Sequence, residues 1–124
     1  MELSPRRFAD AVVVSPVGRI DQSNADVFEE KLAPHLARCT GGEDRLIVDL
    51  SGLEYISSAG LRVLMLAAKQ SKAQGGTLLL TGLQPLVQEI FEISRFTMVF
   101  GITPSLREAL AKASAAALTA FETA

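Results

Sequence analysis

The sequence predicts one α/β domain over residues 1–124, with a four- to five-stranded, mixed and mostly parallel sheet flanked by about four helices. Short apolar runs typical of strands alternate with longer stretches whose apolar residues recur at helical spacing. Parallel strands need crossover connections, which are nearly always right-handed. After a first hairpin, this alternation places the antiparallel first strand at or near a sheet edge. A chain of 124 residues has room for only one ordinary domain.

The N-terminal segment predicts a hairpin. Ala11–Val14, continued by Val17, is typical of a strand, which ends at Gly18–Asp21. A shorter strand around Arg7–Ala9 would precede it across a tight turn.

The first helix is predicted to begin at Ser23. This serine is the expected N-cap, because Asp26 follows three residues later as the acidic half of a capping box. Pro34 lacks a backbone donor and is expected to kink the helix, which Gly41 and Gly42 would end. The apolar residues that share one face of this helix are Phe28, Leu32, Leu36 and Cys39.

The central segment combines a buried strand with an apolar helix. Leu46–Leu50 is apolar apart from Asp49, a pattern typical of a parallel strand that is covered on both faces. Ser57 and Ser58 then precede an apolar helix that runs to about Gln74. Either serine could cap this helix by accepting a hydrogen bond from an otherwise unpaired backbone N–H.

The C-terminal half predicts two further strands and two helices. Thr77–Leu80 predicts a strand, and Pro85 opens the helix that follows it. Met98–Phe100 predicts the last strand, after which Thr103 caps a helix with Pro104 at its first position. The residues expected to point inward from the helix that begins at Pro85 are Leu86, Ile90 and Ile93.

The end of the chain supports two alternatives. An apolar stripe at near-helical spacing predicts that the last helix continues past Lys112 and packs on the sheet edge or on a second copy. The Ala-rich residues 113–124 could instead form a frayed tail. The stripe consists of Leu106, Leu110, Ala113, Ala117 and Phe121.

Composition and charge exclude several classes of function. Twelve basic and fourteen acidic residues give a net charge of −2 without a basic cluster, which argues against direct nucleic-acid binding. The single Cys39 and the single His35 are too few for an intrachain disulfide or a zinc site. No apolar stretch is long enough for membrane insertion, and the polar N-terminus does not resemble a secretory signal, so a cytoplasmic location is expected.

The residues of familiar catalytic sites are also missing, so no enzymatic activity, cofactor or metal is expected. A nucleophilic Ser57 or Ser58 would need a base within hydrogen-bond reach, and neither serine lies in a G-x-S-x-G turn. No phosphate-binding glycine loop follows a strand. Asp49 lies where a phosphoryl-accepting receiver domain has its aspartate, but the acidic pair and the lysine that would support it are absent.

A continuous central stretch, Leu46–Leu64, closely resembles the signature of the STAS domain family, typified by bacterial anti-sigma factor antagonists. Gly18–Asp21 resembles the family's G-x-[LI]-D element, and Gly75–Leu80 matches a later segment. The resemblance covers about residues 8–112 and leaves 113–124 as a helical extension or tail.

This resemblance implies regulation by partner switching. Such a protein, when unphosphorylated, binds an anti-sigma factor that is also a serine kinase and itself binds the ATP. Phosphorylation of one serine in a D-S-[SAT]-G-L element then releases the kinase, and a PP2C-type phosphatase restores binding. On matching, that serine is Ser58, whereas Ser57 replaces a common aspartate and Ala59 a common second serine. The partner surface that the resemblance implies consists of Asp21, Ser23, Ser57, Ser58, Ala59, Gly60 and Arg62.

Two other roles of the family stay open. STAS domains also serve as partner subunits of membrane lipid or anion transport systems, and as scaffolds in stress-signalling assemblies. A scaffold usually carries a further domain, and a transport partner often lacks the acceptor serine that is present here at Ser58. The protein itself is expected to be a monomer or a weak homodimer.

Overall fold

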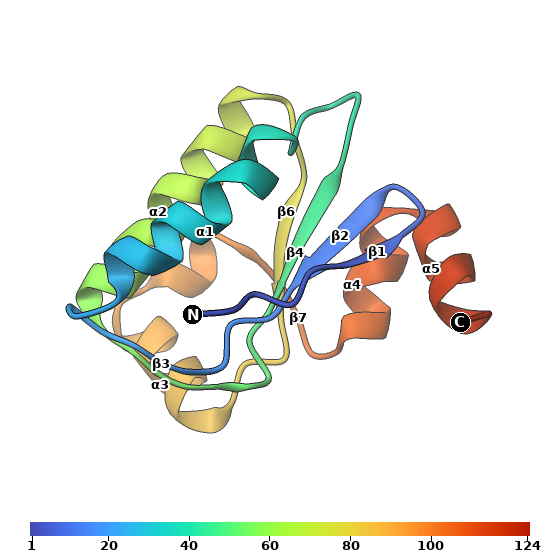
Figure 1. The fold of residues 1–124 in the computed structure, drawn as a ribbon. Coiled ribbons are helices and arrows are strands. Elements are labelled where there is room, and N and C mark those ends of the chain that lie inside the picture. The colour runs from blue at the N-terminus through green and yellow to red at the C-terminus, as the bar shows by residue number, and fades with distance from the viewer.

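The structure is a computed structural model that describes residues 1–124. Strands and helices alternate along most of the chain (Figure 1). In chain order the elements are β1 (Arg6–Phe8), β2 (Ala11–Val14), β3 (Gly18–Ile20), α1 (Ala25–Ala37), β4 (Arg45–Asp49), β5 (Leu53–Ile56), α2 (Ser58–Ala73), β6 (Leu78–Thr81), α3 (Pro85–Ile93), the 3₁₀ helix η1 (Phe96–Met98), β7 (Gly101–Thr103), α4 (Leu106–Ala113) and α5 (Ala115–Glu122).

Five strands form the main sheet in the order β1-β2-β4-β6-β7. β1 lies at the edge and runs antiparallel to β2, whereas every other neighbouring pair is parallel. The prediction of a mixed, mostly parallel sheet with an antiparallel first strand at an edge is therefore confirmed. β3 and β5 form a second, two-stranded parallel sheet. The sequence pattern does not predict β5, because this strand follows β4 closely and has no continuous apolar run.

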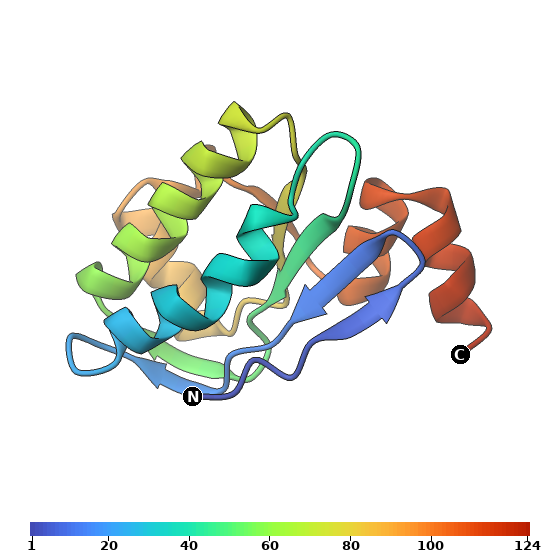
Figure 2. The ribbon, with the colours of Figure 1, turned by 45° about the horizontal axis from the view of Figure 1, so that its top comes forward.

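Helices cover both faces of the main sheet (Figures 1 and 2). α1 and α2 lie against one face, and α4 and α5 lie against the other. Neighbouring residues of β4 divide accordingly: Leu46 and Val48 belong to a larger core with Phe28, whereas Ile47 belongs to a smaller core with Ala117. The predicted pattern of a strand covered on both faces is confirmed.

α1 begins later than predicted. Its N-cap is Asn24, and Ser23 lies in the turn before it. The Asn24 side chain does not cap the helix, because its Oδ1 accepts a hydrogen bond from Asp21 N and its Nδ2 donates to Arg19 O, both at 2.8 Å. The prediction of Ser23 as N-cap is therefore wrong, since Asn24 closes the turn toward β3. α1 continues through Pro34 to its end at Ala37.

α3 buries a different face from the one predicted. Val87 and Phe91 are fully buried, whereas Leu86 is 50% and Ile93 75% exposed. Ile90 is partly buried against the core, as predicted. Leu86, Ile90 and Ile93 recur at helical spacing, and so do Val87 and Phe91, so spacing alone does not choose between these two adjacent stripes.

The last strand also differs from its prediction. The apolar Met98–Phe100 does not form a strand: the 3₁₀ helix η1 ends at Met98, and β7 pairs with β6 from Gly101 onward. Thr103 belongs to β7, so it cannot cap α4. Ser105 takes that place, and its Oγ accepts a hydrogen bond from Glu108 N at 3.2 Å.

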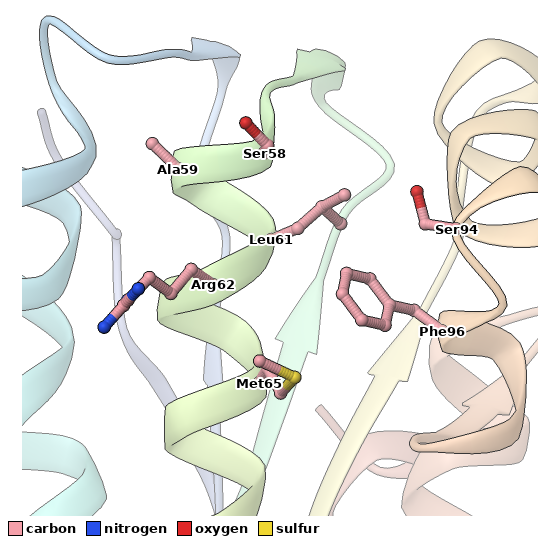
Figure 3. Close-up of a pocket in the computed structure, with 7 residues that line it drawn as sticks. All are labelled: Ser58, Ala59, Leu61, Arg62, Met65, Ser94 and Phe96. Carbon is pink, nitrogen blue, oxygen red and sulfur yellow. The ribbon is translucent and has the colours of Figure 1, made fainter.

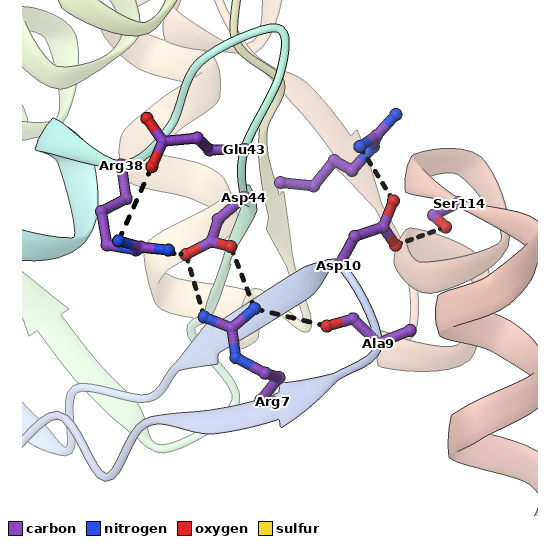
Figure 4. Close-up of polar contacts among 8 residues, drawn as sticks. Arg7, Ala9, Asp10, Arg38, Glu43, Asp44 and Ser114 are labelled. Atoms are coloured by element: carbon purple, nitrogen blue, oxygen red, sulfur yellow. Dashed lines mark hydrogen bonds and ion pairs between the residues drawn. The ribbon is translucent and has the colours of Figure 1, made fainter.

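The predicted C-terminal helix is broken into two at Ser114 (Figure 4). This residue is extended, with φ −168° and ψ 130°, and its Oγ donates to Asp10 Oδ1 at 2.6 Å and accepts from Ala117 N at 3.2 Å. The break turns α5 back onto the sheet, where Phe121 contacts Phe8 edge-on with ring centroids 5.5 Å apart. The apolar stripe therefore packs at the sheet edge, but along two helices and not one.

The Asp44 carboxylate, in the loop before β4, binds one arginine of the N-terminal hairpin and a second arginine that follows α1 (Figure 4). Both Arg7 guanidinium N–H groups donate to the Asp44 carboxylate, at 2.9 and 3.0 Å, and Arg38 Nε donates to it at 3.1 Å. Asp44 is only 7% exposed, so these donors replace water around a nearly buried charge. The hydrogen bonds from Arg7 lower the pKa of Asp44 most, and the bond from Arg38 adds to this effect, so the pKa stays below its usual value.

Candidate functional site

The site lies at the carboxyl ends of the two strands of the small sheet. β3 and β5 run parallel with Ile20 opposite Ile56, and Ser57 N donates to Ile20 O at 2.8 Å. Because parallel strands end at the same edge, the segments that follow them, which begin with Asp21 and Ser57, are brought together. The two motifs quoted from distant parts of the sequence therefore meet at one place.

The two adjacent serines at the start of α2 have different roles. Ser57 is the N-cap: its backbone is extended, its Oγ accepts a hydrogen bond from Gly60 N at 3.4 Å, and its carbonyl accepts one from Leu61 N at 2.9 Å. Ser58 is the first residue of the helix, is exposed, and its Oγ forms no hydrogen bond within the chain. The capping role that the sequence assigns to either serine thus falls on Ser57.

Gly60 sets how closely α2 approaches the small sheet. A Cβ at this position would lie 2.7 Å from both Ile20 Cγ2 and Ile56 Cγ1, closer than real contacts allow. Both isoleucines are buried, so neither can turn into solvent to make room. Gly60 is itself buried, and it contributes to the site by its packing.

Asp21 is held as a carboxylate beside the start of α2. Its Oδ1 accepts hydrogen bonds from Ser23 Oγ at 2.5 Å and from Ser23 N at 2.9 Å. These bonds, the side-chain bond first, keep the pKa of Asp21 below its usual value. A carboxylate with a lowered pKa stays ionised at neutral pH, so a fixed negative charge stands next to the two serines.

Ser58 lies between two hollows in the surface. On one side it shares a hollow with Ser57 and with the turn after β3, which contributes Asp21 and Ser23. On the other side it borders a hollow of about 450 Å³, with Arg62 in the same wall (Figure 3). Ala59 also lines this second hollow. The residues that sequence reasoning missed in these two walls are Arg19, Gln22, Tyr55, Leu61, Met65, Ser94 and Phe96.

Arg19 and Tyr55 carry a sequence signal that could have found them. They lie opposite each other on β3 and β5, and the Arg19 guanidinium stacks over the Tyr55 ring at 4.4 Å from its centroid. Arg19 is exposed and Tyr55 half-buried, and each directly precedes a buried isoleucine, so the alternation of side chains along a strand directs both to the face opposite Ile20 and Ile56. Ser94 and Phe96 have no such signal, since their position depends on the turn at Arg95.

Two properties bear on other classes of function. No three side chains of His, Cys, Asp or Glu come together in a way that could hold a metal ion. None of the helices has the length and apolar character needed to span a membrane.

Comparison with known proteins identifies the family. Residues 3–109 match the STAS domain, and the chain therefore belongs to the STAS domain family. The chain is 42% identical over 118 residues to the Bordetella bronchiseptica protein named "Putative anti-sigma factor antagonist BtrV", a match that covers 95% of this chain and 98% of the relative.

Solved structures share the fold. The Thermotoga maritima protein TM1081 superposes with a TM-score of 0.81 at 20% identity, over 90% of this chain and 93% of that one. The anti-sigma factor antagonist SpoIIAA in its unphosphorylated form superposes with a TM-score of 0.70 at 17% identity, over 88% of this chain and 93% of that one. At these identities the similarity shows a shared fold.

Proposed function

We propose that the protein is an anti-sigma factor antagonist that acts by partner switching in the cytoplasm and has no catalytic activity of its own. Unphosphorylated, it binds an anti-sigma factor that is also a serine kinase and that supplies the ATP site. Phosphorylation of Ser58 releases the kinase, and a PP2C-type phosphatase restores binding. The 42% identity to an anti-sigma factor antagonist supports this class of partner.

The observation that carries the proposal is the state of the Ser58 hydroxyl. It is exposed and makes no hydrogen bond within the chain, so a kinase can reach it without opening the fold. Ser57 is half-buried, and its Oγ caps α2. SpoIIAA, which shares the fold with a TM-score of 0.65, has been solved in a phosphorylated form. A protein of this fold can therefore carry a phosphate, which supports the proposal.

Electrostatics gives the phosphate opposite effects on fold and partner. A phosphoserine adds a charge of about −1.5 to −2 at pH 7. At the first residue of a helix this charge meets the favourable end of the helix dipole, so stability should change by no more than about 1 kcal/mol. Inside a protein–protein contact, a mismatched buried charge costs about 2–5 kcal/mol. The modification should therefore break the contact and leave the domain folded.

The contact would surround the acceptor. Asp21 and Ser23 form the rim on the β3 side, and Ser57, Ala59 and Arg62 extend it along α2. Gly60 lies beneath this surface, where the absence of a side chain lets α2 pack closely against Ile20 and Ile56 of the small sheet. We expect the ionised Asp21 to take part in the contact as an acceptor of hydrogen bonds.

A reconstituted reaction tests the proposal. The kinase is the protein retained by the immobilised chain from an extract of the source cells, then identified and purified. Incubation with ATP should label wild-type protein and Ser57→Ala at Ser58 by mass spectrometry, and should leave Ser58→Ala unlabelled.

Two measurements on the phosphoprotein complete the test. Its melting temperature should stay close to that of the unmodified protein, while its affinity for the kinase falls at least about 30-fold, the lower end of the cost given above. Labelling at Ser57, a large drop in melting temperature, or unchanged kinase affinity would each contradict the proposal.

A further inference from the structure

α2 faces a second segment of the chain, residues 94–101, along much of its length. Two hollows lie between α2 and this segment. One is near Ser58 (Figure 3), and the other is near the C-terminal end of the helix, where Gly75, Gly76 and Leu78 also line it. We refer to the two hollows together as the α2 groove. The α2 residues that line it are Ser58, Ala59, Leu61, Arg62, Met65, Ala68, Ser71 and Lys72, most of which recur at helical spacing.

The groove is apolar at its base and along its far rim. Leu61 and Met65 face Phe96 across the first hollow. On the opposite segment Met98 is 88% and Val99 49% exposed, and Ile93, at the end of α3 just before it, is 75% exposed. Single exposed apolar residues are ordinary, but three within seven residues of the chain, with Val99 lining the second hollow, are typical of an interaction surface.

The charge that lines the groove is of one sign. Arg62 is the only charged side chain in the first hollow, and Lys72 is the only one in the second. Neither forms an ion pair within the chain, and no Asp or Glu lines either hollow. An occupant with complementary charge is therefore acidic.

We infer that the α2 groove binds an acidic, amphipathic segment of the same partner that contacts Ser58, and this inference rests on the proposed function. Apolar side chains of that segment pack between Met65 and Phe96, while its carboxylates pair with Arg62 and Lys72. Recognition of an amphipathic segment by an apolar groove with charged borders is a recurring mode of binding.

This arrangement also explains why a phosphate at Ser58 would act strongly. Ser58 lies at one end of the groove, on the same helical face as Arg62 one turn away. A phosphate there brings a charge of about −1.5 to −2 next to the acidic segment and competes with it for the Arg62 guanidinium. The groove thus changes from attractive to repulsive for the same occupant.

Calorimetric titration of unphosphorylated variants with the purified kinase tests the inference. Arg62→Glu and Lys72→Glu should each weaken binding at least about tenfold at low salt, and high salt should reduce this difference. Lys69→Glu is the matched control, because Lys69 is on the same helix, is exposed and lines neither hollow. It should change binding by less than about threefold.

A second pair of variants tests the apolar rim. Val99→Ser should weaken binding about fivefold or more, because it removes an apolar side chain that lines the second hollow. Val17→Ser, at a residue that is 68% exposed away from the groove, should have no measurable effect. Both sites are exposed, so neither change should alter folding, which circular dichroism checks.

Ser58→Asp in the same titration separates the inference from the proposed function. If Ser58→Asp abolishes binding while the groove variants bind like wild type, the groove assignment is overturned and the switch stands. If Ser58→Asp binds like wild type while the groove variants fail, the groove is supported and Ser58 is not the switch. If Lys69→Glu weakens binding as much as Lys72→Glu, only net charge matters and the groove is rejected.

Discussion

Replacing Gly60 with alanine should strain the junction that holds α2 to the small sheet. The new Cβ would lie 2.7 Å from Ile20 Cγ2 and from Ile56 Cγ1, and ordinary contact begins at 3.4 Å. Both isoleucines are buried, so the helix itself must move outward. That movement would carry Ser58 away from the turn that holds Asp21.

The net cost follows from two opposing effects. Overpacking of this kind costs about 1–3 kcal/mol. Replacing glycine by alanine inside a helix gains about 1 kcal/mol. The free energy of unfolding should therefore fall by about 1 kcal/mol, which in a domain of this size lowers the melting temperature by roughly 3–5 °C.

Urea denaturation followed by circular dichroism measures the effect. Gly42→Ala is the control, because a Cβ there meets no atom within 4 Å, and it should not destabilise. Ile20→Ala removes the Cγ2 methyl group, one of the two clashing groups, so Gly60→Ala should cost less in that background, with a coupling of about 0.5–3 kcal/mol. A clash at this junction is refuted if Gly60→Ala stabilises the protein by the full helix propensity of alanine, or if the effects of Gly60→Ala and Ile20→Ala are additive.

Three further predictions concern other contacts. The pKa of Asp44 is lowered in the folded state, so the contribution of this carboxylate to stability is present at pH 5–7 and is lost as the pH falls below about 4. The urea midpoints of wild type and Asp44→Asn should therefore converge below about pH 4. Ser114→Ala removes the cap of α5 and should cost about 1–2 kcal/mol, with faster amide exchange in residues 115–122 but not in α2. Ser57→Ala should cost about 0.5–1 kcal/mol in thermal melts, because its capping bond is long at 3.4 Å, and should leave phosphorylation of Ser58 intact.

Each of these predictions has an outcome that contradicts it. A constant difference in stability between wild type and Asp44→Asn down to pH 2 would mean that Asp44 does not titrate as described. Uniformly faster exchange in Ser114→Ala would mean that α5 does not unfold separately from the rest. Loss of labelling in Ser57→Ala would mean that the cap, and not the exposed hydroxyl alone, defines the substrate.

Local patterns predicted the elements that depend on local information. The main strands follow from continuous apolar runs such as Leu46–Leu50, because a strand buried on both faces needs apolar side chains in both directions. The candidate site could be proposed for a similar reason. Ser58 lies in the continuous stretch Leu46–Leu64 and Asp21 ends the G-x-[LI]-D element, so matching to the family needed no knowledge of packing. The parallel pairing of β3 and β5 then brings the two together.

Tertiary contacts decided the features that were predicted wrongly. Met98–Phe100 is as apolar as a strand, but Arg95 adopts a left-handed backbone with φ 60° that starts η1 instead. β7 begins at Gly101, which pairs with Leu79 on β6. A Cβ at this position would lie 2.7 Å from Leu79 Cδ2, so the close pairing requires glycine. The far wall of the α2 groove depends on the same turn, so the groove could not be predicted from the sequence.

The break at Ser114 illustrates how distant residues override helical periodicity. The stripe from Leu106 to Phe121 fits one helix, and no glycine or proline interrupts it. Arg45 from β4 donates to the last carbonyl of α4, that of Ala113, at 3.1 Å, and Asp10 from the hairpin turn accepts from the Ser114 hydroxyl. The Ala113 carbonyl and the Ser114 hydroxyl therefore both have hydrogen-bond partners at the break, which offset the helical hydrogen bonds that the break removes.

The division of roles between Ser57 and Ser58 explains how this surface can change without the fold changing. The capping bond and the bond to β3 are made by Ser57, and the close approach to Ile20 and Ile56 is made by Gly60. The Ser58 side chain contributes to none of these contacts. A phosphate on the proposed acceptor Ser58 would therefore remove no interaction from the interior, and its effect would fall on whatever binds at the surface. In the proposed switch, Ser57 would fix the start of the helix beside the acceptor, and as a serine it adds no negative charge there.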